Sequence, residues 1–102
     1  MFLVHVPIRP RRPEAEIPDS AAELIALSCA GRDDFEHVSV HPHALPHPVI
    51  GFYVRAESLS EARAAALSLW RRASSNLVQL QGWEPLRAES PLFRPDLETG
   101  AP

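Results

Sequence analysis

One helix-start pattern occurs twice in this sequence, and it constrains the fold more than any other feature. A serine stands three residues before a glutamate at Ser20–Glu23 and again at Ser58–Glu61, each time directly ahead of an apolar helical pattern. In such a capping box the serine hydroxyl accepts from the backbone N–H of the glutamate, whose carboxylate reaches back to the serine N–H. The two boxes therefore predict helices over 21–30 and 59–74.

The two predicted helices have different apolar faces. Gly31 follows the first helix and suits a left-handed C-terminal cap. The second helix is rich in alanine, and small side chains let a helix backbone approach a sheet closely, with Trp70 expected at the edge of this face. The apolar face of the first helix consists of Ala21, Leu24, Ile25, Leu27 and Ser28, and that of the second helix consists of Ala62, Ala65, Ala66, Leu69 and Ala73.

Segments with the composition of strands surround the helices. Residues 2–8 are rich in β-branched and aromatic side chains, whereas 35–41 and 49–56 alternate apolar and polar residues. These segments predict three strands. A fourth strand is expected after the second helix, over 77–80 or 83–89, and the pattern leaves both positions open.

Chain length and proline positions define the predicted domain. A chain of 102 residues has room for one core of independent stability. Its 11 prolines gather in 7–18, 42–48 and 85–102, where the ring removes a backbone donor and favours loops. We predict a single domain over 1–90 followed by a flexible proline-rich tail over 91–102.

The predicted element order, β-α-β-β-α-β, resembles the ferredoxin-like split βαβ arrangement, which is an α+β fold. The resemblance implies an antiparallel sheet with both helices on one face. In the similar dimeric α/β-barrel proteins, two uncovered sheet faces pack together around a ligand cavity, which implies a homodimer. Those proteins include small monooxygenases, isomerases, stress-response and ligand-sensing domains, so the resemblance names no reaction and carries over no catalytic residue.

Charge and cysteine content narrow the classes of function. The formal net charge of −3 argues against nucleic-acid binding, which requires clustered cations. No stretch reaches the roughly 18 apolar residues of a membrane span, so we expect no membrane association and a cytoplasmic location. The single Cys29 excludes an internal disulfide and is expected to be a buried hydrophobe. Because glycine-rich phosphate loops and paired cysteines are also missing from the sequence, we predict no cofactor.

Histidines form the one concentration of site chemistry. Successive side chains of a strand point to opposite faces of its sheet. If the β-branched and aromatic residues face the helices, the intervening residues of the three strands face outward together. This alternation predicts a ligand-binding face formed by His5, His37, His41, Tyr53 and Arg55.

Three interpretations of this face stay open. It is a polar sheet surface or dimer interface, a pocket in which Arg55 binds an anion and Tyr53 donates, or a metal site built from imidazoles. Against the metal site, no carboxylate or cysteine is placed with the histidines. His37 and His41 also lie roughly 13 Å apart on one strand, at about 3.3 Å per residue. Only His41 with His43, or histidines of neighbouring strands, can share an ion.

Two further histidines, His43 and His47, lie in the connection between the second and third predicted strands. Pro42, Pro46 and Pro48 stiffen this connection. We interpret it either as a loop that covers a pocket on the sheet or as a solvated hairpin loop.

The leading functional hypothesis is a small accessory domain that dimerises, or binds a ligand or protein partner, through its open sheet face. The alternative is a cofactor-independent enzyme of the small monooxygenase or isomerase kind. In that enzyme His37 or His41 is the base, and Arg55 and Tyr53 bind an oxyanion. A third hypothesis is histidine-mediated metal binding. An enzyme predicts an apolar cavity, whereas an interaction module predicts a flat apolar patch.

Overall fold

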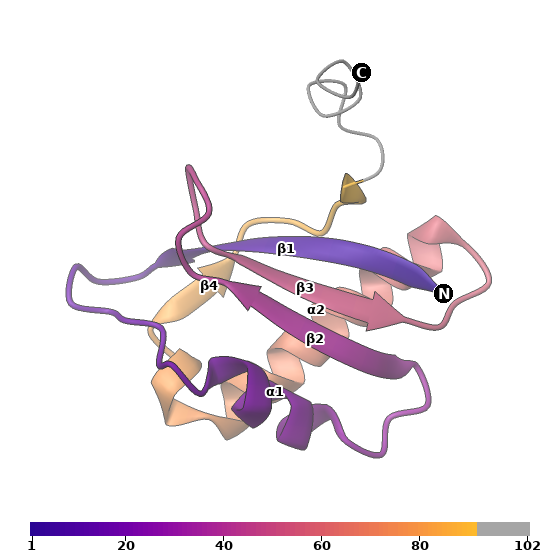
Figure 1. Ribbon diagram of the computed structural model, residues 1–102, viewed down its shortest axis with the longest axis horizontal. Helices are drawn as coiled ribbons and strands as arrows, with labels where there is room; N and C mark the ends of the chain where they lie inside the picture. Colours follow the sequence, from indigo (N-terminus) through magenta and orange to yellow (C-terminus); the bar gives the residue numbers. More distant parts are fainter. Residues whose placement is uncertain (92–102) are drawn as a thin grey trace.

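The computed structural model describes residues 1–91, and the tail predicted over 91–102 lies, apart from Pro91, outside the described residues. The elements follow the predicted order (Figure 1). They are β1 (Phe2–Pro10), α1 (Ala21–Cys29), β2 (Phe35–His41), β3 (Val49–Val54), α2 (Leu59–Asn76), the 3₁₀ turn η1 (Val78–Leu80) and β4 (Trp83–Pro85).

The four strands form one antiparallel sheet in the order β2-β3-β1-β4. Because each neighbouring pair is antiparallel, β1 runs parallel to β2 with β3 between them, and β3 runs parallel to β4 with β1 between them. The strands of each βαβ unit are thus split by a strand of the other unit. The predicted α+β class with an antiparallel sheet is confirmed.

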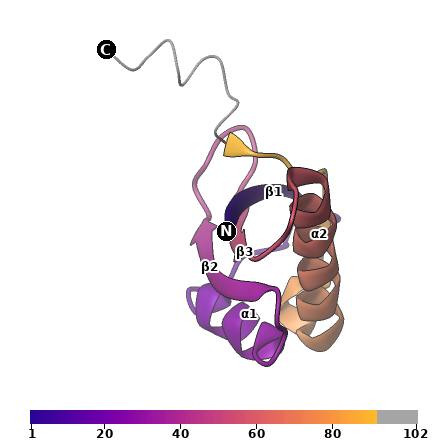
Figure 2. The ribbon, with the colours of Figure 1, turned by 90° about the vertical axis from the view of Figure 1, so that its right-hand side faces the viewer.

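Both helices lie on the same side of the sheet (Figure 2). Helix α2 packs across β1 and β3, and α1 packs against β2 and α2. The core between these layers contains alternate strand residues, and its largest fully buried side chain is Trp70 rather than an edge residue as predicted. Trp83 also joins the core, where its Nε1 donates to the Glu16 carbonyl over 3.3 Å.

The structure selects the later of the two positions left open for the fourth strand. Residues 78–80 form a 3₁₀ turn instead of a strand. Strand β4 pairs with the end of β1, and the chain then continues beside β1 to a bridge between His5 and Glu89. Three steps along β1, from Ile8 to His5, correspond to four steps from Pro85 to Glu89, so the C-terminal segment contains one extra residue.

Strand β1 extends two residues beyond its predicted end at Ile8, despite the prolines. The Pro7 carbonyl accepts from the Leu86 N–H over 2.9 Å, but Pro7 has no N–H to return. The register shift of the C-terminal segment falls beside this residue, after Leu86. Pro7 therefore leaves the pairing of β1 with β3 intact, and the register shift lies on the opposite edge of β1, whereas Pro10 lies beyond the residues that pair with β3.

The two predicted capping boxes differ in the structure. Ser58 has extended backbone angles and its Oγ accepts from the Glu61 N–H over 3.1 Å, as predicted. Ser20 makes no side-chain cap, so that prediction is wrong. Its φ of −89° and ψ of 12° are not the extended angles of a capping residue, because a turn in which Ala21 N–H donates to Pro18 O precedes the helix.

Helix α1 buries a narrower face than predicted. Its fully buried residues are Ala21, Ile25 and Cys29, which follow at every fourth position, whereas Leu27 is 75% exposed. The helix lies at the β2 end of the sheet, so only one stripe meets other elements. Gly31 has a φ of 91°, in the left-handed region that its position was predicted to require. Among residues 1–91, no helix combines the length and apolar character needed to cross a membrane.

Candidate functional site

No helix of the described chain covers the second face of the sheet, which we call the open face (Figures 1 and 2). Strand pairing arranges its side chains in three rows. The first row is His37, Tyr53 and Leu3; the second is Ser39, Gly51, His5 and Glu89; the third is His41, Val49 and Pro7. A bulge at Glu36 allows Phe35 to pack against the core while His37 pairs with Tyr53 on the open face.

Four of the predicted site residues, His5, His37, His41 and Tyr53, lie in these rows, where they separate into two pairs. The imidazole rings of His5 and His41 have centroids 6.0 Å apart at an angle of 53°. The His37 and Tyr53 rings form a second pair with centroids 5.5 Å apart. The structure therefore brings together two aromatic pairs, not one constellation.

Arg55, the predicted anion-binding residue, lies just beyond the end of β3 and has other partners. Its Nη1 donates to the Asp33 carbonyl over 2.9 Å, and its Nε is paired with the Glu36 carboxylate. Asp33, Asp34, Glu57 and Glu61 line the shallow cleft beside it. An anion here would have to compete with these carboxylates.

Gly51 is central to the open face because no side chain rises there. A Cβ atom at this position would lie 2.6 Å from Ser39 Oγ and 3.6 Å from His5 Cδ2. The hydroxyl of Ser39 is also 3.2 Å from His41 Nε2, which orients the His41 ring. The glycine thus allows the polar side chains of β1 and β2 to approach each other over β3.

Glu89 is a candidate residue that the strand alternation did not identify. It exchanges two backbone hydrogen bonds with His5, at 2.7 and 2.9 Å, and such directly opposed residues have side chains on the same face. The Glu89 carboxylate is 2.9 Å from Arg87 Nε. The Glu89 carboxylate therefore lies on the same face as His5. It belongs to the segment after β4, whose pairing the sequence left open.

A cleft of about 530 Å³ lies between the open face and the connection from β2 to β3. We call it the imidazole cleft, because its polar side chains are all histidines. It is lined by His5, Val40, His41, Pro42, His43, Ala44, Leu45 and Val49. Of the predicted site residues, His5, His41 and His43 contribute, while His37, His47, Tyr53 and Arg55 do not.

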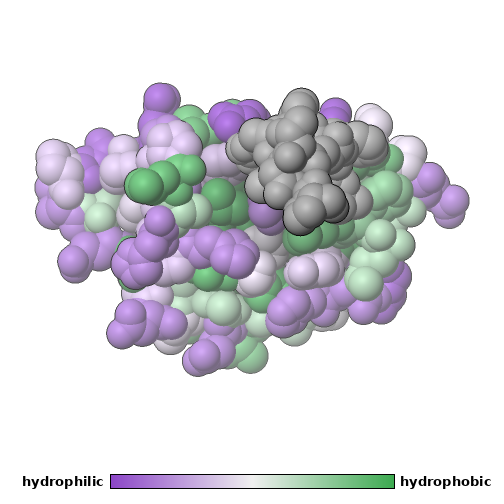
Figure 3. Space-filling view, turned by 45° about the horizontal axis from the view of Figure 1, so that its top comes forward, coloured by the Kyte–Doolittle hydropathy of each residue, from purple (hydrophilic) through white to green (hydrophobic). Residues whose placement is uncertain are grey.

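The connection that forms one wall of this cleft is the proline-rich segment 42–48. It contains a cis peptide bond between Leu45 and Pro46, and the Leu45 side chain is 91% exposed. On the side of the molecule that Figure 3 presents, hydrophobic residues lie in small groups separated by hydrophilic ones.

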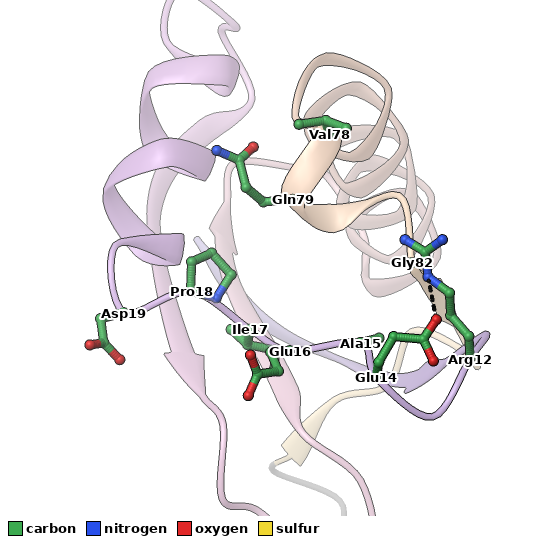
Figure 4. Close-up of a pocket in the computed structure, with 10 residues that line it drawn as sticks. All are labelled: Arg12, Glu14, Ala15, Glu16, Ile17, Pro18, Asp19, Val78, Gln79 and Gly82. Carbon is green, nitrogen blue, oxygen red and sulfur yellow. Dashed lines mark ion pairs between the residues drawn. The ribbon is translucent and has the colours of Figure 1, made fainter.

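A second cleft of about 560 Å³ lies between the 12–19 segment and η1 (Figure 4). Its one arginine, Arg12, is 3.6 Å from the Glu14 carboxylate, and both side chains are mostly exposed. Three carboxylates line this cleft, from Glu14, Glu16 and Asp19. Its charged groups are solvated and partly paired, so it offers a ligand less than the imidazole cleft does.

The chemistry of metals and thiols is limited in the described chain. Among residues 1–91, no three histidine, cysteine, aspartate or glutamate side chains are placed to hold one metal ion. Cys29 is fully buried, its Sγ lies 3.7 Å from the Leu69 carbonyl, and burial raises the pKa of its thiol despite Arg72 and Arg32. A thiol in this environment is a packing residue, as predicted.

No family model, curated protein or solved structure matches this chain. Its site is therefore interpreted from its own geometry.

Proposed function

We propose that this chain is a small-molecule-binding domain and that the imidazole cleft is its site. The observation that carries the proposal is the convergence of His5 and His41, from strands on either side of β3, beside aliphatic walls. Ligand sites are typically clefts of about 300–1,000 Å³ with apolar walls and a few convergent polar groups. The cleft volume of about 530 Å³ lies in this range.

The split order of the strands supports a ferredoxin-like fold. It also supports a second candidate function, self-association through the open face. The observation in its favour is that both helices cover the other face, so the rows around Gly51 have no partner layer within the described chain. Light scattering coupled to gel filtration tests this candidate, because a monomer at micromolar concentration would eliminate it.

The enzyme hypothesis receives less support from the site. It required Arg55 and Tyr53 beside a basic histidine. Neither lines the imidazole cleft, and Arg55 is engaged by Glu36 and by the Asp33 carbonyl. A binding function needs only the contacts that the cleft provides.

A two-dimensional ¹H–¹⁵N NMR titration with small aromatic fragments tests the proposed function. Binders should shift the backbone signals of His5, His41, Ala44 and Val49. The His41→Ala substitution should weaken fragment binding about tenfold, because one side of the cleft loses its polar group. His37→Ala is the matched control, since His37 shares the open face but lies outside the cleft. Shifts confined to 12–19 and 78–82, or no binding, would reject the proposal.

A further inference from the structure

We infer that the ligand of the imidazole cleft is a small apolar acid, an aromatic or alicyclic molecule with one carboxylate or acidic hydroxyl. This inference rests on the proposed function and specifies the chemistry of the same site. Its basis is the composition of the lining. Five residues are aliphatic or proline, the other three are histidines, and no carboxylate or guanidinium is among them.

The geometry of the two rings directs them at a shared ligand. His5 and His41 belong to strands on opposite sides of β3, and strands two spacings apart are separated by about 10 Å. Their ring centroids are nevertheless 6.0 Å apart, so the two side chains lean toward each other over β3. They can do so because Gly51 has no side chain between Ser39 and His5.

The hydrogen-bonding capacity of the rings favours an acid. Ser39 is within hydrogen-bond distance of His41 Nε2, at 3.2 Å, which leaves Nδ1 to meet a ligand. An imidazole donates an N–H in either protonation state, and when protonated it also carries a positive charge. A carboxylate gains from both properties. A ligand ammonium gains less, because it can donate only to the acceptor nitrogen of a neutral imidazole and the lining contains no full negative charge.

Charged and polar groups from several segments surround the two imidazole rings. The C-terminal segment places Glu89 opposite His5, and Arg87 lies 2.9 Å from that carboxylate and offsets its charge. Strand β2 contributes the Ser39 hydroxyl, β3 contributes only Val49 and Gly51 in these rows, and the connection contributes His43.

Three probes with one apolar body test the inference on the full-length protein. They are 2-naphthoate, 2-naphthylmethanol and 2-naphthylmethylammonium, followed by NMR shifts of the cleft residues. We expect naphthoate to bind about tenfold or more tightly than the ammonium compound. Naphthoate should also bind more tightly than the alcohol, because charge-assisted hydrogen bonds are stronger than neutral ones.

Two substitutions sharpen the assignment. His41→Gln keeps a hydrogen-bonding side chain but removes the imidazole, so it should reduce the preference for naphthoate over the alcohol. Gly51→Ala forces Ser39 away from His41, because the new Cβ would lie 2.6 Å from Ser39 Oγ, and should weaken naphthoate binding. His37→Ala should change neither.

The outcomes separate the inference from the function on which it rests. If the ammonium compound binds as tightly as naphthoate, or if His41→Gln retains the full preference for naphthoate over the alcohol, the ligand is not an acid held by these rings. In that case the cleft still binds small molecules. If none of the three probes shifts the cleft residues, the proposed function itself is wrong.

Discussion

The two faces of the sheet use alternate residues of the same strands, yet they have opposite properties. On the helix-covered face Val4, Ile50 and Phe52 are fully buried. On the open face their neighbours His5 and Tyr53 belong to rows of polar and aromatic side chains that close over Gly51. Apolar burial specifies the first face, whereas the second is free to carry chemistry because the fold does not need it for packing.

Truncating adjacent aromatic residues of β3 tests whether the two faces of the sheet contribute differently to stability. Phe52→Ala removes a fully buried ring and should lower the free energy of unfolding by about 3–5 kcal/mol. Tyr53→Ala removes a half-buried ring whose nearest aromatic partner is His37, and should cost about 1 kcal/mol. Urea denaturation measures both changes. If Phe52→Ala does not fold, Phe52→Leu provides the measurement, and a larger loss for Tyr53→Ala would contradict the distinction between the faces.

The covered face also depends on two helices that begin differently, and their first residues test this. Ser58→Ala removes the hydroxyl that accepts from the Glu61 N–H and should cost about 1 kcal/mol. Ser20→Ala is the matched control, because Ser20 makes no side-chain cap and should change stability by less than about 0.5 kcal/mol. Thermal denaturation followed by circular dichroism compares them. Equal losses would mean that both serines cap their helices in solution.

A further effect appears only at alkaline pH and concerns the thiol on the covered side. Burial raises the pKa of Cys29, so the folded state retains this proton to higher pH than the unfolded state does. The stabilisation is fully present below the unfolded pKa and is lost as pH rises, by at most about 1.4 kcal/mol per pH unit. Urea denaturation at about pH 8 and about pH 10 should show a steeper loss for the wild type than for Cys29→Ala. Identical losses would show that Cys29 does not contribute.

Much of this architecture could be predicted because its signals are local. The bounds of β2 and the starts of α1, β3 and α2 agree with prediction, since alternation and helical spacing depend on neighbouring residues. The Ser20 cap was wrong because its hydrogen bond depends on the backbone angles of the preceding turn. Trp70 was placed at an edge because helical periodicity alone does not show how many elements meet around a side chain.

The candidate site was predicted only in part. Alternation placed His5 and His41 on one face, but the 6.0 Å separation of their rings depends on strand order and on the glycine between them. The role expected of Arg55 failed to account for Glu36, which meets it through a bulge that alternation does not reveal. Glu89 was missed because it joins the sheet only through an irregular pairing with His5.

Apolar periodicity in the sequence was enough to predict the two helices, the first three strands and the core-facing residues of those strands, because these features depend on neighbouring residues. Only the tertiary structure decided that residues 83–89 rather than 77–80 complete the sheet, and that His5 and His41 meet beside the 42–48 connection. These features join residues far apart in the chain. Their register depends on pairing between strands, which no local pattern encodes.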